Sequence, residues 1–440
     1  MYLKGSRWSY TRRRKRSNPW RVIFLAILVG AAIYINQVVV PATPPLFIPT
    51  ATPTRAPESF VADAENLLEQ GKMLPAIAAY QQAVEADPKN PANYVALARL
   101  QIYTGKYQDA VVNAENALLL NANNSMALAL RGWAKGFTGD YLEAIGSLKD
   151  AIKIDPNNAS AYAYLAEVIA LQVQAGEDTL GSLEQAIEAS RMAQQLGPNL
   201  METHRARGIV LEMTSNYEEA AREFEAAIAI NTNIADLHLA LGRNYRSLEQ
   251  YEKAVEEFNR ANALNPSDPL PLTYISRTYA SVGEYAKAIQ FGEQAVKISP
   301  EDAFLYGNLG TMYYRNREYP KAITNLRLAV RGGKTEEGVE VKGLPLNYGR
   351  VAEYYYTYGL ALARQSDCNE AVQISNMLLQ AVPNDETSVY NAQEMVNICK
   401  DVVGKIPTLA PNALTPSPQP SATATPPIVM PIPTGTMTTP

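Results

Sequence analysis

Few side chains in this sequence are placed where they could do chemistry, and the two histidines come first. His204 and His238 are 34 residues apart and are the only histidines among 440 residues. Two imidazoles held side by side could share a metal ion, but no cysteine or carboxylate partner is evident nearby. The string Gly-Gly-Lys-Thr at residues 332–335 resembles a phosphate-binding loop, yet that motif needs a glycine where Leu328 stands. We therefore predict no metal, no nucleotide and no other cofactor.

The sequence contains few other residues that could support catalysis. The sequence has no nucleophile elbow, no zinc-protease helix and no glycine-rich dinucleotide fingerprint. Carboxylates are plentiful, but they fall among Lys and Arg on helix faces, as solvated helices require. Two cysteines in the whole chain exclude a disulfide-rich scaffold and a Cys/His zinc module. We predict a protein that has no catalytic residues and is not an enzyme.

The net charge of −5 conceals a difference between the N-terminus and the rest of the chain. Residues 1–21 hold eight Lys and Arg and no acid, whereas the remainder holds 31 Lys and Arg against 44 Asp and Glu. An acidic chain without a broad basic surface is not expected to bind nucleic acid. The basic run is better explained by the segment that follows it.

Residues 22–40 read VIFLAILVGAAIYINQVVV, a stretch without a charge. At about 1.5 Å per residue, such a helix just spans a hydrocarbon core of roughly 30 Å. We predict a transmembrane signal-anchor helix here, with residues 1–21 as a basic cytoplasmic segment under the positive-inside rule. The rest would then lie outside the cytoplasm of a bacterial cell. A cleaved signal peptide is the alternative, although no small-x-small site precedes Pro41, and a twin-arginine export signal is a further one.

Two proline-rich segments flank the middle of the chain. Residues 41–57 form a Pro/Thr-rich linker that cannot be a helix, because its prolines remove donors and fix φ. Residues 405–440 form a Pro/Thr/Ser-rich tail with almost no charge, which we predict to be disordered. The tail could be a plain solubilising segment, or a stalk that carries sugars or threads a cell wall.

Internal repeats dominate the region between these segments. Each repeat contains two amphipathic stretches joined by a short turn, and the next boundary is often Asp-Pro, Asn-Pro or Ser-Pro. Turn residues recur 34 apart at Pro88, Ala122 and Pro156, and again at Pro198, Thr232, Pro266 and Pro300. A Tyr-x-x-Ala marker keeps the same phase from Tyr107 to Tyr319. Small residues let the two helices approach closely, and neither can bury its apolar face alone, so the units must stack.

These markers resemble the tetratricopeptide repeat (TPR) family, over about residues 58–404. The resemblance implies an all-α fold: a right-handed α-solenoid of about nine helical hairpins with a capping helix, in addition to the transmembrane helix. The units would start at Pro57, Pro91, Ser125, Ala159, Met201, Ala235, Pro269, Ala303 and Ala352, and the capping helix at Glu386. Two departures stand out. The fourth unit is too long by eight residues, around residues 172–181, and residues 332–350 form an insertion that we predict to be a small β-hairpin or flap.

The resemblance also gives the two cysteines a role. Cys368 would open the second helix of unit nine, and Cys399 would lie near the end of the capping helix. Those ends should meet, because the capping helix runs antiparallel to that second helix. We predict a Cys368–Cys399 disulfide that fastens the terminal unit, and two buried free thiols are the alternative.

In this family, partners bind a concave groove lined by the first helix of each unit. Units six to nine supply most of the cations, while unit one supplies carboxylates. Carried over by position, the candidates are Arg243, Arg246, Arg277, Tyr314, Arg315, Arg364 and Tyr356; Arg99, Tyr103, Trp133 and Phe137; and Glu58, Glu65 and Glu69. We expect Arg243, Arg277 and Arg315 to contact an acidic peptide, with Tyr314 and Trp133 as anchors. Alternatively, these arginines pair with glutamates of neighbouring helices. The family's Lys/Asn carboxylate clamp is not carried over, since only Asn308 matches it.

Together these features predict a non-enzymatic, membrane-anchored scaffold that holds a protein or acidic peptide in its groove on the extracytoplasmic side. A targeting receptor with its repeats in the cytosol would have the same plan. A spacer or envelope-anchoring module, with the tail as its functional part, is a further alternative. An enzyme or ligand-binding protein would need its chemistry in residues 332–350.

Overall fold

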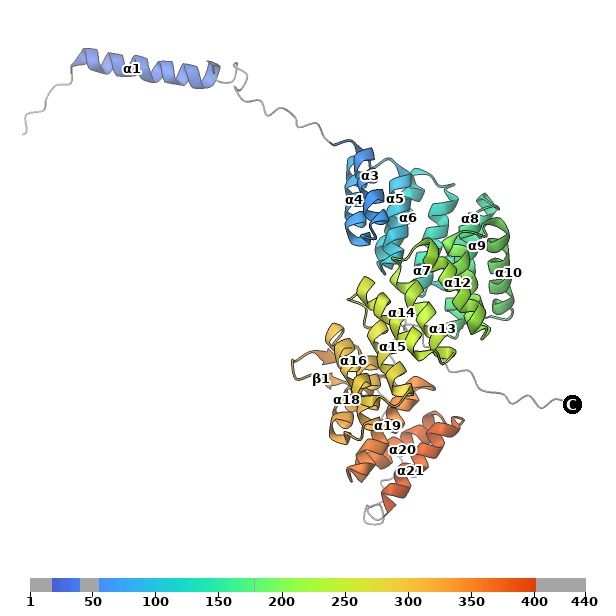
Figure 1. Cartoon of the computed structure of the whole chain (residues 1–440). Helices are drawn as coiled ribbons and strands as arrows, with labels where there is room; N and C mark the ends of the chain where they lie inside the picture. The colour runs from blue at the N-terminus through green and yellow to red at the C-terminus, as the bar shows by residue number, and fades with distance from the viewer. Residues whose placement is uncertain (1–17, 40–54, 178, 401–440) are drawn as a thin grey trace, which may run out of the picture. The chain divides into compact units, whose positions relative to one another are not determined.

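The computed structural model of the chain describes residues 18–39, 55–177 and 179–400. It divides into two units, Met1–Ala56 and Pro57–Pro440 (Figure 1). Most of the predicted segments 1–21 and 41–57, and all of 405–440, lie outside the described residues.

The first unit contains one long apolar helix. Helix α1 covers Pro19–Tyr34 and continues as a single π-helical stretch, η1, over Ile35–Val39. Asn18 caps its start by accepting a hydrogen bond from the backbone N–H of Trp20 at 3.2 Å. Residues Pro19–Val38 are long and apolar enough to cross a membrane, with a mean hydropathy of 1.8. The support for a membrane span is the length and composition of this helix, which a signal sequence near the N-terminus would share.

The second unit is a succession of antiparallel helical hairpins closed by a single helix, which confirms the expected solenoid (Figure 1). The nine hairpins are α3 Pro57–Glu69 with α4 Met73–Ala86, α5 Pro91–Tyr103 with α6 Tyr107–Leu120, α7 Ser125–Phe137 with α8 Tyr141–Ile154, α9 Ala159–Gln174 with α10 Ser182–Leu196, α11 Met201–Met213 with α12 Tyr217–Ile230, α13 Ala235–Ser247 with α14 Tyr251–Leu264, α15 Leu270–Ser281 with α16 Tyr285–Ile298, α17 Ala303–Arg315 with α18 Tyr319–Arg331, and α19 Arg350–Arg364 with α20 Cys368–Ala381. The capping helix α21 covers Glu386–Ile398.

Small residues set the spacing inside each hairpin. At Gly132 of α7, an added Cβ would meet the backbone oxygen of Ala144 at 2.7 Å, and at Gly242 of α13 it would meet the Phe258 ring at 2.5 Å. Alanines of the second helices, such as Ala144, are fully buried. The recurring Gly and Ala of the sequence therefore mark the contact line between the two helices of a unit.

The turn within each hairpin requires a left-handed backbone at one residue. Glycine occupies this position in five units, at Gly71, Gly105, Gly139, Gly176 and Gly283. In the other four units the same conformation, with φ near 60°, is adopted by Ser215, Glu249, Arg317 and Ser366. Because a side chain disfavours this region, those four turns are strained.

The two departures from the repeat have defined structures. In the fourth unit, α9 and α10 are 16 and 15 residues long instead of 13 and 14, and a longer loop joins them. The insertion forms a hairpin in which β1 (Gly333–Lys334) pairs antiparallel with β2 (Glu340–Val341). It packs on the ninth unit, because Val341 is buried and the Tyr355 hydroxyl donates to the Leu344 backbone oxygen at 2.8 Å.

The C-terminal end of the solenoid is held covalently. Cys368, the first residue of α20, forms a disulfide with Cys399, which directly follows α21. Met395 of α21 lies against Gly359 of α19, where an added Cβ would come within 2.4 Å of its sulfur. Helix α21 thus covers the apolar face that the last hairpin would otherwise expose.

Candidate functional site

The first helices of the early units do not leave an open groove, because side chains fill the space between them. Trp133 of α7 is fully buried, and it stacks on Tyr164 of α9 with ring centroids 4.1 Å apart. Tyr103 of α5 meets the edge of Trp133, and its hydroxyl donates to Glu202 of α11 at 3.1 Å. This contact joins residues 99 positions apart, so the solenoid closes on itself between its second and fifth units.

A second contact supports this closure. At Gly71, in the turn of the first unit, an added Cβ would lie 2.6 Å from the side chain of Asn233, which precedes α13. Met73 of α4 packs against the apolar cluster that α11, α12 and α13 form around Phe224. The first and sixth units are therefore neighbours in space.

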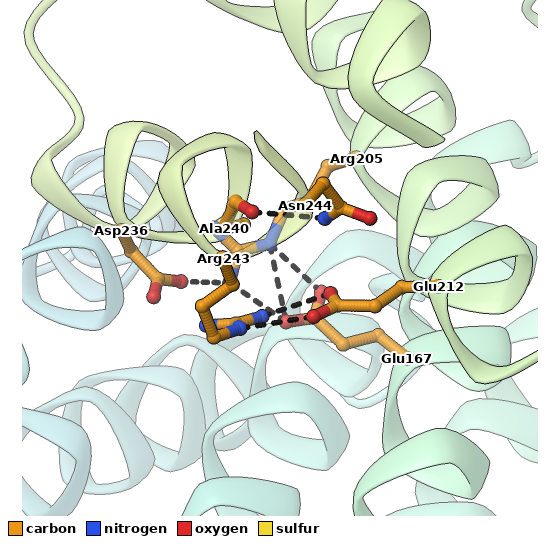
Figure 2. A network of polar contacts seen from close by, with 7 residues as sticks. All are labelled: Glu167, Arg205, Glu212, Asp236, Ala240, Arg243 and Asn244. Atoms are coloured by element: carbon orange, nitrogen blue, oxygen red, sulfur yellow. Dashed lines mark hydrogen bonds and ion pairs between the residues drawn. The ribbon is translucent and has the colours of Figure 1, made fainter. Parts of the chain in front are cut away.

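A chain of buried and half-buried charges lies inside this closed part (Figure 2). Arg205 of α11 is 5% exposed and binds Glu167 of α9 through Nη2–Oε1 at 2.8 Å and Nε–Oε2 at 3.1 Å. The same guanidinium also pairs with Asp236 of α13 and lies over the Trp133 ring. One cation thus holds three successive units together, with two carboxylates sharing its charge.

Beside this chain, Arg243 of α13 binds Glu212 of α11 through two hydrogen bonds of 3.0 Å, from Nε and Nη2 (Figure 2). Such a fork pairing uses both oxygens of the carboxylate. Arg243 was a predicted partner contact, but its guanidinium is engaged within the protein. For this residue the alternative interpretation, pairing with a glutamate of a neighbouring helix, describes the structure.

One repeat later the same two positions carry different charges. Arg277 and Arg246 lie 34 residues after Arg243 and Glu212 respectively, so an arginine stands where the glutamate was. Both guanidiniums lie over the ring of Tyr274, at 5.4 Å for Arg246 and 5.9 Å for Arg277. Among the described residues, no carboxylate forms an ion pair with either one. We call Arg246 and Arg277 the arginine pair.

The surroundings of the arginine pair add positive charge. Burial, together with the nearby charges of Arg350 and Arg246, lowers the pKa of Arg277 to about 10. Arg350, the first residue of α19, pairs with Glu353 at 2.7 Å. The hydroxyl of Tyr354 is buried and lacks a hydrogen-bond partner in the described part of the chain. Half-buried cations without a counter-charge are costly, and an anion placed among them would remove that cost.

The remaining predicted groove residues are mostly engaged. Arg315 of α17 lies 3.5 Å from a carboxylate oxygen of Glu353, and Arg364 of α19 donates to the Tyr314 hydroxyl at 3.2 Å. Tyr356 is half-buried. Phe137 stacks on Tyr107 of α6 with centroids 4.4 Å apart.

Two expectations need correction. Trp133 cannot anchor a partner in this structure, because the closure buries it completely.

A carboxylate does lie beside each histidine: His204 Nδ1 is 2.7 Å from Glu223 Oε2, and His238 Nδ1 is 2.6 Å from Glu257 Oε2. These glutamates lie 19 residues along the chain, on the second helix of the same unit. Each histidine thus joins its own hairpin, and the described residues contain no cluster of three metal-binding side chains.

Family models for the tetratricopeptide repeat match residues 227–301, residues 79–112, and residues 64–90 with 127–158. The matched segments fall on the hairpins described above. This chain contains tetratricopeptide repeats. Proteins with such repeats generally act as scaffolds that bind other proteins.

Several solved structures resemble this TPR protein. A tetratricopeptide repeat protein from Parabacteroides merdae is 17% identical, with 58% of this chain and 98% of that one covered at a TM-score of 0.37. Pseudomonas aeruginosa pilF is 18% identical, with 53% and 96% covered at 0.41. Yeast Tom70 is 12% identical, with 78% and 96% covered at 0.38. No curated protein matches the sequence.

Sequence analysis missed the paired charges of the TPR solenoid, namely Glu167, Arg205, Glu212 and Asp236, and it missed Arg350. The first four occupy the same groove-lining positions that identified Arg243 and Arg277, so the repeat phase could have found them. Their pairing could have been inferred from the 31-residue spacing of Glu212 and Arg243. Arg350 belongs to no repeat position, because it follows the insertion.

Proposed function

We propose that this TPR protein is a non-enzymatic scaffold that binds an acidic segment of a partner protein at the arginine pair. One observation carries the proposal: the repeat position that holds Glu212 in one unit holds Arg246 in the next. Arg277 therefore lies beside a like charge, whereas Arg243 lies beside a carboxylate. A carboxylate of the partner would take the place that Glu212 has beside Arg243. The flat face of Tyr274 would support both guanidiniums.

The rest of the proposal concerns location. Residues 19–38 would anchor the chain in a bacterial cell membrane, with the repeats on the extracytoplasmic side, as the basic residues 1–21 favour. The disulfide fits an oxidising compartment. An anchored scaffold raises the local concentration of whatever it holds near the membrane.

Photocrosslinking in intact cells tests the binding site with the full chain. A photoreactive residue at Ser281, one helical turn beyond Arg277 and exposed, should give a discrete adduct, whereas one at Glu256 of α14 should not. In the Arg246→Glu background the adduct at Ser281 should disappear, because the introduced carboxylate would satisfy Arg277 internally. Lys149→Glu, on the exposed face of α8, makes the same charge change and should leave the adduct intact.

Two results would contradict the proposal. One is an adduct at Ser281 that survives Arg246→Glu, and the other is equal crosslinking from Glu256. Location is tested separately by reacting intact cells with a membrane-impermeant reagent after placing a cysteine at Lys149 in the disulfide-bonded chain. Labelling supports an extracytoplasmic solenoid, and labelling only after lysis supports the cytosol-facing alternative.

A further inference from the structure

A cavity of about 410 Å³ lies where the closed part of the solenoid meets its own later units. Its lining includes Tyr107, Trp133 and Phe137 of the second and third units. It also includes Asp236 and Asp268, from the sixth unit and the start of the seventh. The volume falls in the range of small-molecule or side-chain sites in proteins, roughly 300–1,000 Å³.

The charge of this cavity is not balanced by the protein. Arg205 is its cation, and that guanidinium is already shared by Glu167 and Asp236. Asp268 has no ion pair within the described residues. Its Oδ1 accepts from the backbone N–H of Leu270 at 2.9 Å, which leaves Oδ2 for another partner. Glu167 and Asp236 thus share the guanidinium of Arg205, and Asp268 is left without a cation paired to it among the described residues.

Two pKa shifts reflect the burial and the negative charge of this cavity. Burial, with the negative charge of Asp236 added to it, raises the pKa of Asp268 although its hydrogen bond to Leu270 opposes the rise. Burial and then the charge of Asp236 also raise the pKa of Tyr107. The stacked rings of Tyr107 and Phe137 also line the cavity, and aromatic rings are the kind of surface that attracts cations.

We propose that this cavity binds an alkylammonium group, with Asp268 as its counter-ion and the ring surface of Tyr107 and Phe137 as its wall. A lysine side chain of a bound protein fits this chemistry, because its peptide carbonyls would also offer acceptors to Asn265 and Ser267, which line the cavity. A free small amine shares the ammonium group without the carbonyls. The cavity site is separate from the arginine pair, and neither proposal depends on the other.

Trp133 provides the measurement. The full chain has three tryptophans, at positions 8, 20 and 133, so Trp8→Phe with Trp20→Phe leaves Trp133 as the sole reporter. The detergent-solubilised full chain is titrated with N-acetyl-lysine amide, with N-acetyl-norleucine amide and with n-butylammonium. We expect a saturable change in Trp133 emission with the lysine derivative and none with norleucine. A weaker response to butylammonium than to the lysine derivative would assign the site to a protein side chain, and an equal response would assign it to small amines.

Variants distinguish the cavity from general electrostatics. Asp268→Asn keeps a cap acceptor for α15 but removes the charge, and we expect lysine affinity to fall about tenfold. Asp302→Asn is the matched control, since Asp302 caps α17 in the same way one repeat later and does not line the cavity. An unchanged affinity in Asp268→Asn, equal binding of norleucine, or no saturable response to either amine would overturn the proposal.

Discussion

At the scale of single residues, the charge at one repeated position decides what the neighbouring arginine does. Arg243 has Glu212 before it and is neutralised within the protein, whereas Arg277 has Arg246 and is not. Sequence analysis selected Arg243 and Arg277 together, because it compared positions within one helix. Their difference depends on the preceding helix, which only a comparison across 31 residues reveals.

Arg246→Glu should therefore stabilise the protein while abolishing partner capture. The pKa of Arg277 in the folded state is below its ordinary value, so the unfolded chain binds this proton more tightly than the folded chain does. The charged Arg277 therefore lowers the free energy of unfolding, and this loss is fully present at neutral pH. Restoring a glutamate should raise the free energy of unfolding by about 1 kcal/mol, after allowing for solvent screening. Denaturant unfolding measures this. The converse variant, Glu212→Arg, should destabilise, and equal stability of both variants would contradict the argument.

At the scale of helices, the repeat phase carried most of the information. Seven of the nine first helices begin at the residue that the repeat predicts, and the other two begin at Leu270 and Arg350, within two residues of it. The insertion was located by the break in phase and its hairpin by alternating Val-Glu-Val-Lys. Helix lengths in unit four were not predictable, since the eight extra residues could enter either a helix or a loop.

The disulfide acts on the last hairpin and its cap. Replacing Cys368 and Cys399 with serine removes a crosslink across 31 residues, which loop-closure entropy values at about 3–4 kcal/mol. Hydrogen exchange should accelerate in α19, α20 and α21 and stay unchanged in α3 to α8, because solenoid units interact mainly with their neighbours. Unchanged exchange in α21, or acceleration throughout, would show that the crosslink does not act locally.

At the scale of the whole solenoid, sequence analysis predicted an open groove and the structure has a closed one in its first part. Closure depends on the small rotation between successive units, summed over six of them, and no single repeat encodes that sum. Trp133 and Tyr103 were accordingly assigned to partner binding, although they hold the protein's own units together.

Closure should make the first six units unfold as one block. Tyr103→Ala removes the edge contact with Trp133 and the hydrogen bond to Glu202, and we expect it to cost about 3 kcal/mol. Native-state hydrogen exchange should lose protection to a similar extent across α3 to α13, and little in α17 to α20. Tyr390→Ala, at an exposed tyrosine of α21, is the control. A loss confined to α5 would mean that the units unfold separately.

The four strained turns have a consequence for how this protein can change. Ser215, Glu249, Arg317 and Ser366 each hold a left-handed backbone at a cost of about 1 kcal/mol relative to glycine, or roughly 4 kcal/mol in total. All four turns lie at hairpin tips, and none of the four residues lines the cavity. Glycine at these four positions would therefore add stability that the present sequence does not have. A lineage that acquires glycine at these tips could tolerate destabilising substitutions on its binding surfaces and so take on new partners without losing the fold.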